Sequence, residues 1–189
     1  MTYPIVVYGH TILRKVAEEI DKDYPGLNQF ISDLFETMHN SEGMGLAAPQ
    51  VGRSIRIFVV DGTPVEDEPE LADFKKVFIN PKIIERKGDM LLMSEGCLSI
   101  PNMREEVNRE SVIRITYYDE NWQFHDEVYD NYKARIIQHE YDHLDGILYT
   151  DRLNPLRKRL IKSKLTAISK GRFESDYKTI LPGQKIKGA

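Results

Sequence analysis

The stretch "IIQHEYDHLDGILY", residues 136–149, carries His139 and His143 four residues apart, with Glu140 directly after the first histidine. On a helix, residues i and i+4 lie on one face, so both imidazoles can reach one metal ion. Glu140 then lies beside the ion without binding it, placed to take a proton from a water that the ion activates. The motif predicts a metal-dependent hydrolase. The alternative at this point is a solvated helix face that matches H-E-x-x-H by chance.

A third ligand is needed, and its identity decides which chemistry such a site performs. The extended pattern H-E-x-x-H-x-x-G-x-x-H fails because Tyr149 occupies the place of its last histidine. A glutamate on a later helix is a poor choice, since the next glutamate is Glu174, in the tail-like "GRFESDYK". We therefore expect the ligand upstream, where "MSEGCLSIPNMR" holds Cys97, the one cysteine of the chain. A lone cysteine is also commonly a small buried hydrophobic residue, and only its combination with the histidines favours a ligand.

This donor set suits several metal ions. Two imidazoles, one thiolate and a water form a tetrahedral site with an exchangeable position, which is typical of catalytic rather than structural metal sites. Thiolate and imidazole suit zinc, iron, cobalt or nickel, and the affinity order alone selects none of them. From the residues alone we expect zinc.

The elements that must position these residues follow from hydrophobic spacing and turn residues. Apolar residues recur at intervals of three and four between Pro25 and Gly43, which predicts a helix with the proline in its first turn and the glycine after its end. Strands are expected in "IRIFVVD", "FINPKIIER" and "VIRITYYDENWQFHDEVY", the last turning as a hairpin near residues 119–121. Further helices are expected over residues 131–144 and 155–170, and an acidic surface loop over residues 63–76.

Strands in the middle and helices at both ends predict the α+β class. We expect antiparallel strands packed around a central helix that bears the HExxH motif, with a C-terminal helix. The 189 residues suffice for one domain with its own core, so residues 1–189 are assigned to a single catalytic domain, with about 173–189 as a tail. The N-terminal residues show no signal pattern, and no stretch approaches the roughly 18 apolar residues of a membrane span. We therefore expect a cytoplasmic protein without a membrane partner.

Three segments, "GMGLAAPQ" (43–50), "EGCLS" (95–99) and "QHEYDH" (138–143), resemble the signature motifs of peptide deformylases, in the family's order and at its usual separations. The resemblance extends from "ILRKVA" near the N-terminus to Leu153. It implies a deformylase-like domain that removes the N-formyl group from the N-terminal methionine of newly made proteins and releases formate. Another metal-dependent amidase or peptidase on the same scaffold stays open, because fold and ligands do not fix the acyl group. A non-enzymatic metal-binding or ribosome-associated module is less favoured, because Glu140 and Gln50 are both present.

The resemblance also implies roles for single residues. It implies Fe(2+) as the ion, with zinc common in the isolated protein and nickel or cobalt as substitutes. The ligands that it implies are Cys97, His139 and His143, with water in the fourth position. Glu140 is expected to act as the base, while the Gln50 side-chain amide and the Leu98 backbone N–H stabilise the oxyanion. Without the resemblance, Gln50 would be read as a surface loop residue and Leu98 as a core residue.

The remaining expectations concern substrate binding and support of the ligands. Gly43 and Gly45 let the backbone approach a turn or an extended substrate, and the resemblance favours the second, with Gly45 pairing to the substrate as an added strand would. Ile136 lies three residues before His139, so it is expected to line the pocket for the methionine side chain, although an isoleucine there is more often core. Two acidic residues are expected either to support the ligands or to pair with Arg104 or Arg109. They are Glu95 and Asp142. Three further histidines have no spacing that indicates a site: His10, His39 and His125.

The C-terminal region has an unusual charge pattern. Residues 152–172 carry eight basic residues and no acidic one, while the whole chain has a formal net charge of −4, so the remainder sums to −12. An apolar side of the expected helix should dock on the domain and leave the basic side exposed. The apolar residues are Leu156, Leu160, Ile161, Leu165 and Ile168. Such a face is usually only solvated, but resembling family members contact the ribosome through a C-terminal helix. The resemblance thus implies formyl-methionyl nascent peptides and the ribosome as partners, without DNA.

Overall fold

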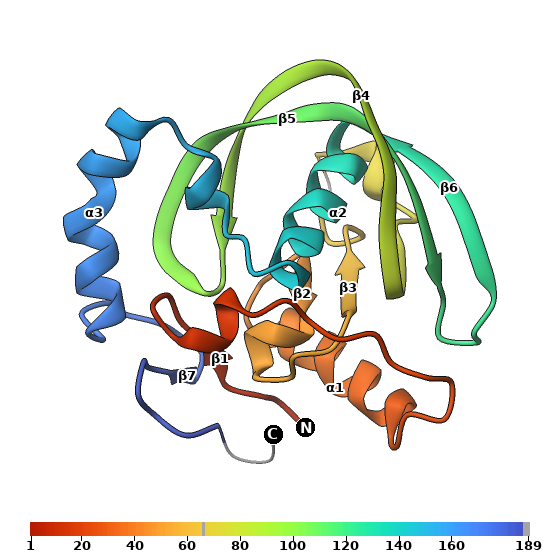
Figure 1. Ribbon diagram of the computed structural model, residues 1–189, viewed down its shortest axis with the longest axis horizontal. Helices are drawn as coiled ribbons and strands as arrows, with labels where there is room; N and C mark the ends of the chain where they lie inside the picture. The colour runs from red at the N-terminus through yellow and green to blue at the C-terminus, as the bar shows by residue number, and fades with distance from the viewer. Residues whose placement is uncertain (66, 187–189) are drawn as a thin grey trace.

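A five-stranded antiparallel sheet curves around one central helix, α2 (Figure 1). The structure is a computed structural model and describes residues 1–65 and 67–186. The strand order is β2-β3-β4-β5-β6; α2 packs against β2, β3, β5 and β6, and its polar side chains reach β4. The α+β prediction, with antiparallel strands around the helix that bears the HExxH motif and a C-terminal helix, is confirmed.

The bounds of the elements are as follows. The strands of the main sheet are β2 (Gly45–Ala47), β3 (Ile57–Asp61), β4 (Lys75–Cys97), β5 (Ile100–Tyr118) and β6 (Phe124–Asp130). A separate parallel pair joins β1 (Ile5–Val6) to β7 (Thr179–Ile180). The α-helices are α1 (Leu27–Asn40), α2 (Asn131–Leu144) and α3 (Pro155–Ser169). The short 3-10 helices among the described residues are η1 (Thr11–Arg14), η2 (Ala48–Val51), η3 (Pro69–Leu71) and η4 (Tyr149–Arg152).

The helix predictions agree closely with the structure, with small differences at the ends. α2 spans the predicted range, and α3 ends one residue early. Pro25 lies before α1 rather than in its first turn, because Gly26 adopts the left-handed conformation (φ 70°) and forms the N-cap. The predicted hairpin near residues 119–121 is the β5–β6 turn, where the Asp119 side chain accepts hydrogen bonds from the backbone N–H groups of Asn121 and Gln123.

The long strand β4 differs most from the prediction. Only its first part, "FINPKIIER", was expected, yet pairing with β5 continues to Cys97. Most side chains between residues 84 and 92 are exposed on both faces, so the alternation that marks a half-buried strand is missing there. The expected loop 63–76 is also shorter in the structure, because Lys75 and Lys76 already belong to β4. Residue 66 of that segment lies outside the described residues.

Two hydrophobic clusters hold the sheet between helices. One includes Phe58, Phe78 and Ile113 of the sheet together with Ala134 and Ile137 of α2. The other packs the apolar face of α1 against the opposite side of β3 and β4. In the described part of the chain, no helix is long and apolar enough to cross a membrane.

Helix α3 docks on the molecule along a narrower stripe than the sequence predicts. Ile161, Leu165 and Ile168 are buried, as expected. The expectation that Leu156 and Leu160 dock with them is wrong, because their relative exposures are 67% and 62%. Leu160 precedes Ile161 by one residue, which places the two side chains about 100° apart around the helix.

Helix α2 is buried although its sequence is polar. Ten of its residues are buried. They are Ala134, Arg135, Ile136, Ile137, Gln138, His139, Glu140, Asp142, His143 and Leu144. Burying a charged group is costly unless it is paired or binds a metal ion, so this helix must find partners for its side chains within the protein.

Candidate active site and metal centre

Three ligand side chains converge where the end of β4 meets α2. Cys97 is the last residue of β4, and His139 and His143 are one turn apart on α2. Their ligand atoms all lie within 4.8 Å of one another, and Cys97 Sγ is 3.3 Å from His143 Nε2. In the described part of the chain, this is the one such cluster of three metal-binding side chains. Two imidazole nitrogens and a sulfur fit a divalent metal ion.

Glu95 fixes the orientation of the first histidine. Its Oε2 is 2.8 Å from His139 Nδ1. Because a carboxylate accepts hydrogen bonds, Nδ1 carries the proton and Nε2 is left as the ligand atom. Burial opposes the charge of Glu95, but hydrogen bonds from Arg109 and His139 outweigh it and hold the pKa of this carboxyl well below its usual range.

Buried ion pairs continue from Glu95 beneath the site. Arg109, only 1% exposed, donates to Glu95 from Nε (2.6 Å) and to Asp142 from Nη1 (2.7 Å). Arg135 donates to Glu95 at 2.7 Å, and Arg152 donates to both oxygens of Asp142 at 2.6 Å. Every charge in this network therefore has an opposite partner, as buried charges require.

Glu95 and Asp142 thus take the roles expected from the sequence, and Arg135 is an additional partner of Glu95. Glu95 both supports a ligand and pairs with Arg109, whereas Arg104 contacts Ser94 instead. The sequence analysis missed Arg135. Its position four residues before His139 places it on the same helix face, which was a usable signal.

Glu140 lies beside the ligands as a buried carboxylate. Its Oε2 atom has no hydrogen-bond partner in the described chain. Burial raises the pKa of Glu140 to about 7. A carboxyl with a pKa near neutrality can both accept and release a proton, which suits a general acid–base role. Gly45 of β2 makes room for it, because a Cβ there would lie 2.5 Å from Glu140 Oε1.

Gln50 and Leu98 approach the ligands from the other side. Gln50, on η2, is buried, and its Oε1 accepts a hydrogen bond from the Ala47 backbone N–H at 2.8 Å. Its Nε2 is therefore directed to Cys97 Sγ (3.5 Å) and Ser99 Oγ (3.3 Å). Gln50 is thus not a surface loop residue. Leu98 is partly buried against the core and also lines the pocket.

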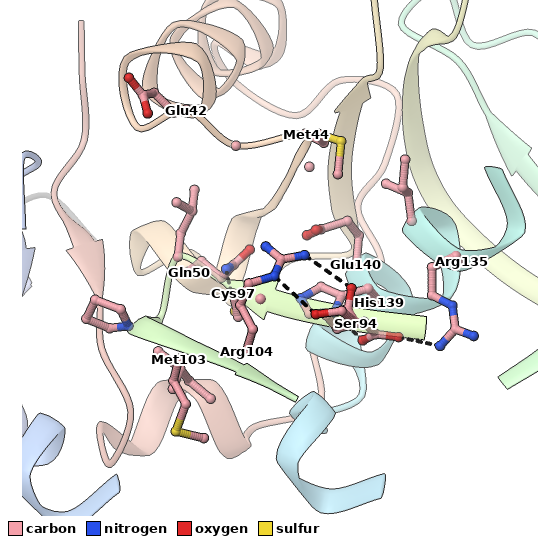
Figure 2. A pocket seen from close by; sticks show the side chains of 18 of the residues that line it. Glu42, Met44, Gln50, Ser94, Cys97, Met103, Arg104, Arg135, His139 and Glu140 are labelled. Carbon is pink, nitrogen blue, oxygen red and sulfur yellow. Dashed lines mark hydrogen bonds and ion pairs between the residues drawn. The ribbon is translucent and has the colours of Figure 1, made fainter. Parts of the chain in front are cut away.

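A pocket of about 540 Å³ opens over these groups (Figure 2). Every site residue singled out from the sequence lines it except His143, which lies deeper in the protein. Figure 2 shows Gln50, Cys97, His139 and Glu140 together, with Met44 and Glu42 farther out along the chain before β2. The sequence analysis missed several lining residues, among them Met44, Met103, Tyr132 and Tyr177.

The other histidines lie outside the pocket. His39 pairs with Asp61 at 2.8 Å and His125 with Asp119 at 2.9 Å. His10 caps η1 by accepting a hydrogen bond from the backbone of Ile12. All three have structural contacts, as expected for histidines without site spacing.

Comparisons with known proteins agree with this geometry. Residues 2–159 match the family model described as polypeptide deformylase. The chain is 52% identical to the peptide deformylase of Christiangramia forsetii, with 98% of both chains covered, and 47% identical to that of Flavobacterium psychrophilum, with 98% of this chain and 100% of the relative covered.

Solved structures show the same fold. The crystal structure of peptide deformylase from Thermus thermophilus matches with a TM-score of 0.81 and 39% identity, covering 90% of this chain and 99% of that one. Peptide deformylase from Plasmodium falciparum matches with a TM-score of 0.80 and 36% identity, covering 88% and 95%. This chain therefore belongs to the polypeptide deformylase family.

Proposed function

We propose that this chain is a metal-dependent hydrolase that removes the N-formyl group from the N-terminal methionine of newly synthesised proteins and releases formate. One observation carries the proposal: the ligand atoms of Cys97, His139 and His143 converge beside the buried carboxylate of Glu140, in a chain of the deformylase family. The substrate is a formyl-methionyl nascent peptide.

The three ligand residues are proposed to hold Fe(2+), the ion that peptide deformylases are expected to use. Zn(2+), Ni(2+) and Co(2+) suit the same sulfur and nitrogen donors. When bound, such an ion supplies Lewis acidity, which lowers the pKa of water and polarises a carbonyl.

Glu140 is proposed to move the proton. Its free Oε2 atom accepts a proton from the attacking water, and the same carboxyl then delivers that proton to the amine nitrogen as the formyl C–N bond breaks. The products are formate and a peptide with a free N-terminal amine. Burial raises the pKa of Glu140 above that of an ordinary glutamate, which favours a carboxyl that both takes up and releases a proton.

Gln50 and Leu98 are proposed to stabilise the negative charge that develops on the formyl oxygen. The Gln50 amide is already oriented by Ala47, so its N–H groups need little reorganisation during the reaction. Leu98 directly follows Cys97 in the sequence, and this adjacency supports its backbone N–H as the second donor.

The peptide chain of the substrate is proposed to bind along β2. This strand is an edge of the sheet, so the backbone of an extended peptide can add to it. Glycine at position 45 lets this strand lie against Glu140, and Gly43 lies close to Leu98, where a Cβ would be 2.9 Å from Leu98 Cδ1. Ile136, in the pocket wall, is proposed to contact the methionine side chain.

The outer face of α3 is proposed to contact the ribosome. Lys158, Arg159 and Lys162 are exposed, and no side-chain hydrogen bond or ion pair is found for them among the described residues. Arg157 differs, because it is paired with Glu105. A basic helix face attracts the anionic RNA surface of the ribosome, where the nascent substrates emerge.

The reaction can be tested with two short peptides. Ferrous protein, prepared without oxygen, should release formate from formyl-Met-Ala-Ser and act far more slowly on acetyl-Met-Ala-Ser, because a site shaped for the smallest acyl group excludes the extra methyl. Formate and free amine are measured. Equal rates on the two peptides would indicate a more general amidase, and no hydrolysis of either would contradict the proposed function.

Two variants separate proton transfer from metal binding. Glu140→Ala should keep its metal and lose about 100-fold or more of the activity, as is typical when a positioned acid–base group is removed. Cys97→Ser should lose metal and activity together, because its thiolate is a ligand. Metal content and turnover are measured on the same samples. Metal loss in Glu140→Ala, or full metal content in Cys97→Ser, would contradict these assignments.

Glu95→Gln tests how the buried carboxylate supports His139. We expect metal affinity to fall by about 10- to 100-fold, as for other residues that orient a metal ligand. At pH 7 the free energy of unfolding should fall by about 3 kcal/mol, because Arg109 and Arg135 lose their buried anionic partner. The matched control is Glu106→Gln, since Glu106 is exposed and has no side-chain hydrogen bond in the described chain.

The difference in the free energy of unfolding between wild type and Glu95→Gln should depend on pH in a direction that follows from the pKa of Glu95. The pKa of Glu95 is lower in the folded than in the unfolded protein, so its stabilisation is fully present above the unfolded value of about 4.3. This stabilisation is lost as the pH falls from that value towards the lower pKa that Glu95 has in the folded protein. The stability difference between wild type and Glu95→Gln, measured by urea unfolding, should therefore shrink on acidification. A constant difference down to pH 3 would argue against this role.

Charge reversal tests the contact with the ribosome. Changing Lys158, Arg159 and Lys162 to glutamate should abolish salt-sensitive co-sedimentation with ribosomes and leave hydrolysis of formyl-Met-Ala-Ser unchanged. Arg157 is left in place, because its pairing with Glu105 stabilises the docking of α3. A control changes Lys22, Lys82 and Lys87 instead, which are exposed and lie outside α3. If the α3 variant sediments with ribosomes like the parent protein, this face is only solvated surface.

A further inference from the structure

We infer that Tyr177, in the segment after α3, is a positioning residue for the catalytic turn that follows Cys97. The Tyr177 hydroxyl donates a hydrogen bond of 2.8 Å to the backbone carbonyl oxygen of Leu98, and the Tyr177 side chain lines the active-site pocket. The inference rests on the proposed function, because the N–H of the same Leu98 is the proposed oxyanion donor.

The turn in question is only two residues long. Cys97 pairs with Ile100, so Leu98 and Ser99 connect β4 to β5 directly at the metal centre. A backbone N–H is useful to an oxyanion only if its peptide plane is held in place before the reaction. Hydrogen bonds from residues outside the hairpin supply such a restraint.

Both carbonyl groups of the turn have a donor from a distant segment. The Ser99 carbonyl accepts a hydrogen bond from the Tyr8 backbone N–H at 2.8 Å, and the Leu98 carbonyl accepts one from the Tyr177 hydroxyl. Tyr8 lies two residues after β1, and Tyr177 lies two residues before β7. Because β1 and β7 pair with each other, the two donors form a joint clamp on the turn.

The segment that carries Tyr177 is itself held in place. On one side, the Ile5 N–H donates to the Lys178 carbonyl at 2.8 Å. On the other, the Asn102 side chain donates to the Glu174 carbonyl at 2.8 Å, and the Asn102 carbonyl accepts from Lys164 of α3 at 2.7 Å. Hydrogen bonds therefore hold the backbone on both sides of Tyr177, and this fixes the position of its hydroxyl.

The family model ends at residue 159, so Tyr177 lies outside the part of the chain that it matches. None of the three sequence motifs includes it. Its role follows from the hydrogen bond and from its place in the pocket wall, and it acts through Leu98 rather than on the substrate.

The test is Tyr177→Phe in the full-length ferrous protein, which keeps the ring and removes the hydroxyl. With formyl-Met-Ala-Ser, kcat should fall about two- to tenfold, the range expected for one lost hydrogen bond, while KM changes less than twofold. Metal content should stay at the wild-type level, because none of the ligands is touched. Peptide-level hydrogen exchange should become faster in the segment containing Leu98 and Ser99.

Tyr24→Phe is the matched control. Tyr24 is also partly buried, but its hydroxyl makes no hydrogen bond in the described chain, so kcat and exchange at the turn should stay unchanged. A kcat for Tyr177→Phe equal to that of wild type, or a loss of activity in proportion to metal content, would overturn the inference. If the wild-type protein shows no deformylase activity, the proposed function fails instead, and the exchange measurement still decides whether Tyr177 holds the turn.

Discussion

The carboxylate of Glu95 is the single group on which both the charge balance and the ligand geometry of this protein depend. It accepts hydrogen bonds from His139, Arg109 and Arg135, and so connects the end of β4 to β5 and α2. Helix α2 presents charged and polar residues to the interior, which an apolar sheet alone would not stabilise. The curved sheet can enclose this helix because Glu95 of β4 pairs with Arg135 of α2, and Asp142 of α2 pairs with Arg109 of β5.

The close packing of β2 against Glu140 is a second constraint on the site. Glu140 has a pKa near neutrality because it is buried, and it is buried because β2 passes directly over it. Only a glycine at position 45 allows this approach. Glycine at position 45 therefore sets the environment of the proposed base.

The sequence predicts the parts of the site that depend on local spacing. His139 and His143 follow from the i, i+4 geometry of a helix, and the range of that helix was correct. Cys97, the one thiol of the chain, was favoured only in combination with the histidines, and the family resemblance implied it as a ligand. The exposed part of β4 was not predictable in the same way, because a strand that is solvated on both faces shows no period-two pattern. The first half of β5 does alternate between buried and exposed residues, but two of its buried positions hold Glu105 and Arg109 instead of apolar residues.

A contact between a side chain and a distant backbone atom is even harder to predict from a sequence. A tyrosine that donates to a carbonyl at a site 79 residues away has no spacing and no required partner type, so nothing in "ESDYKTI" indicates the role of Tyr177. The family match, which ends at residue 159, carries the ligand residues and Glu140 but not this part of the pocket wall. The proposed reaction can therefore be inferred from the motifs, whereas the inferred restraint on the proposed oxyanion donor comes from a segment that the motifs do not include.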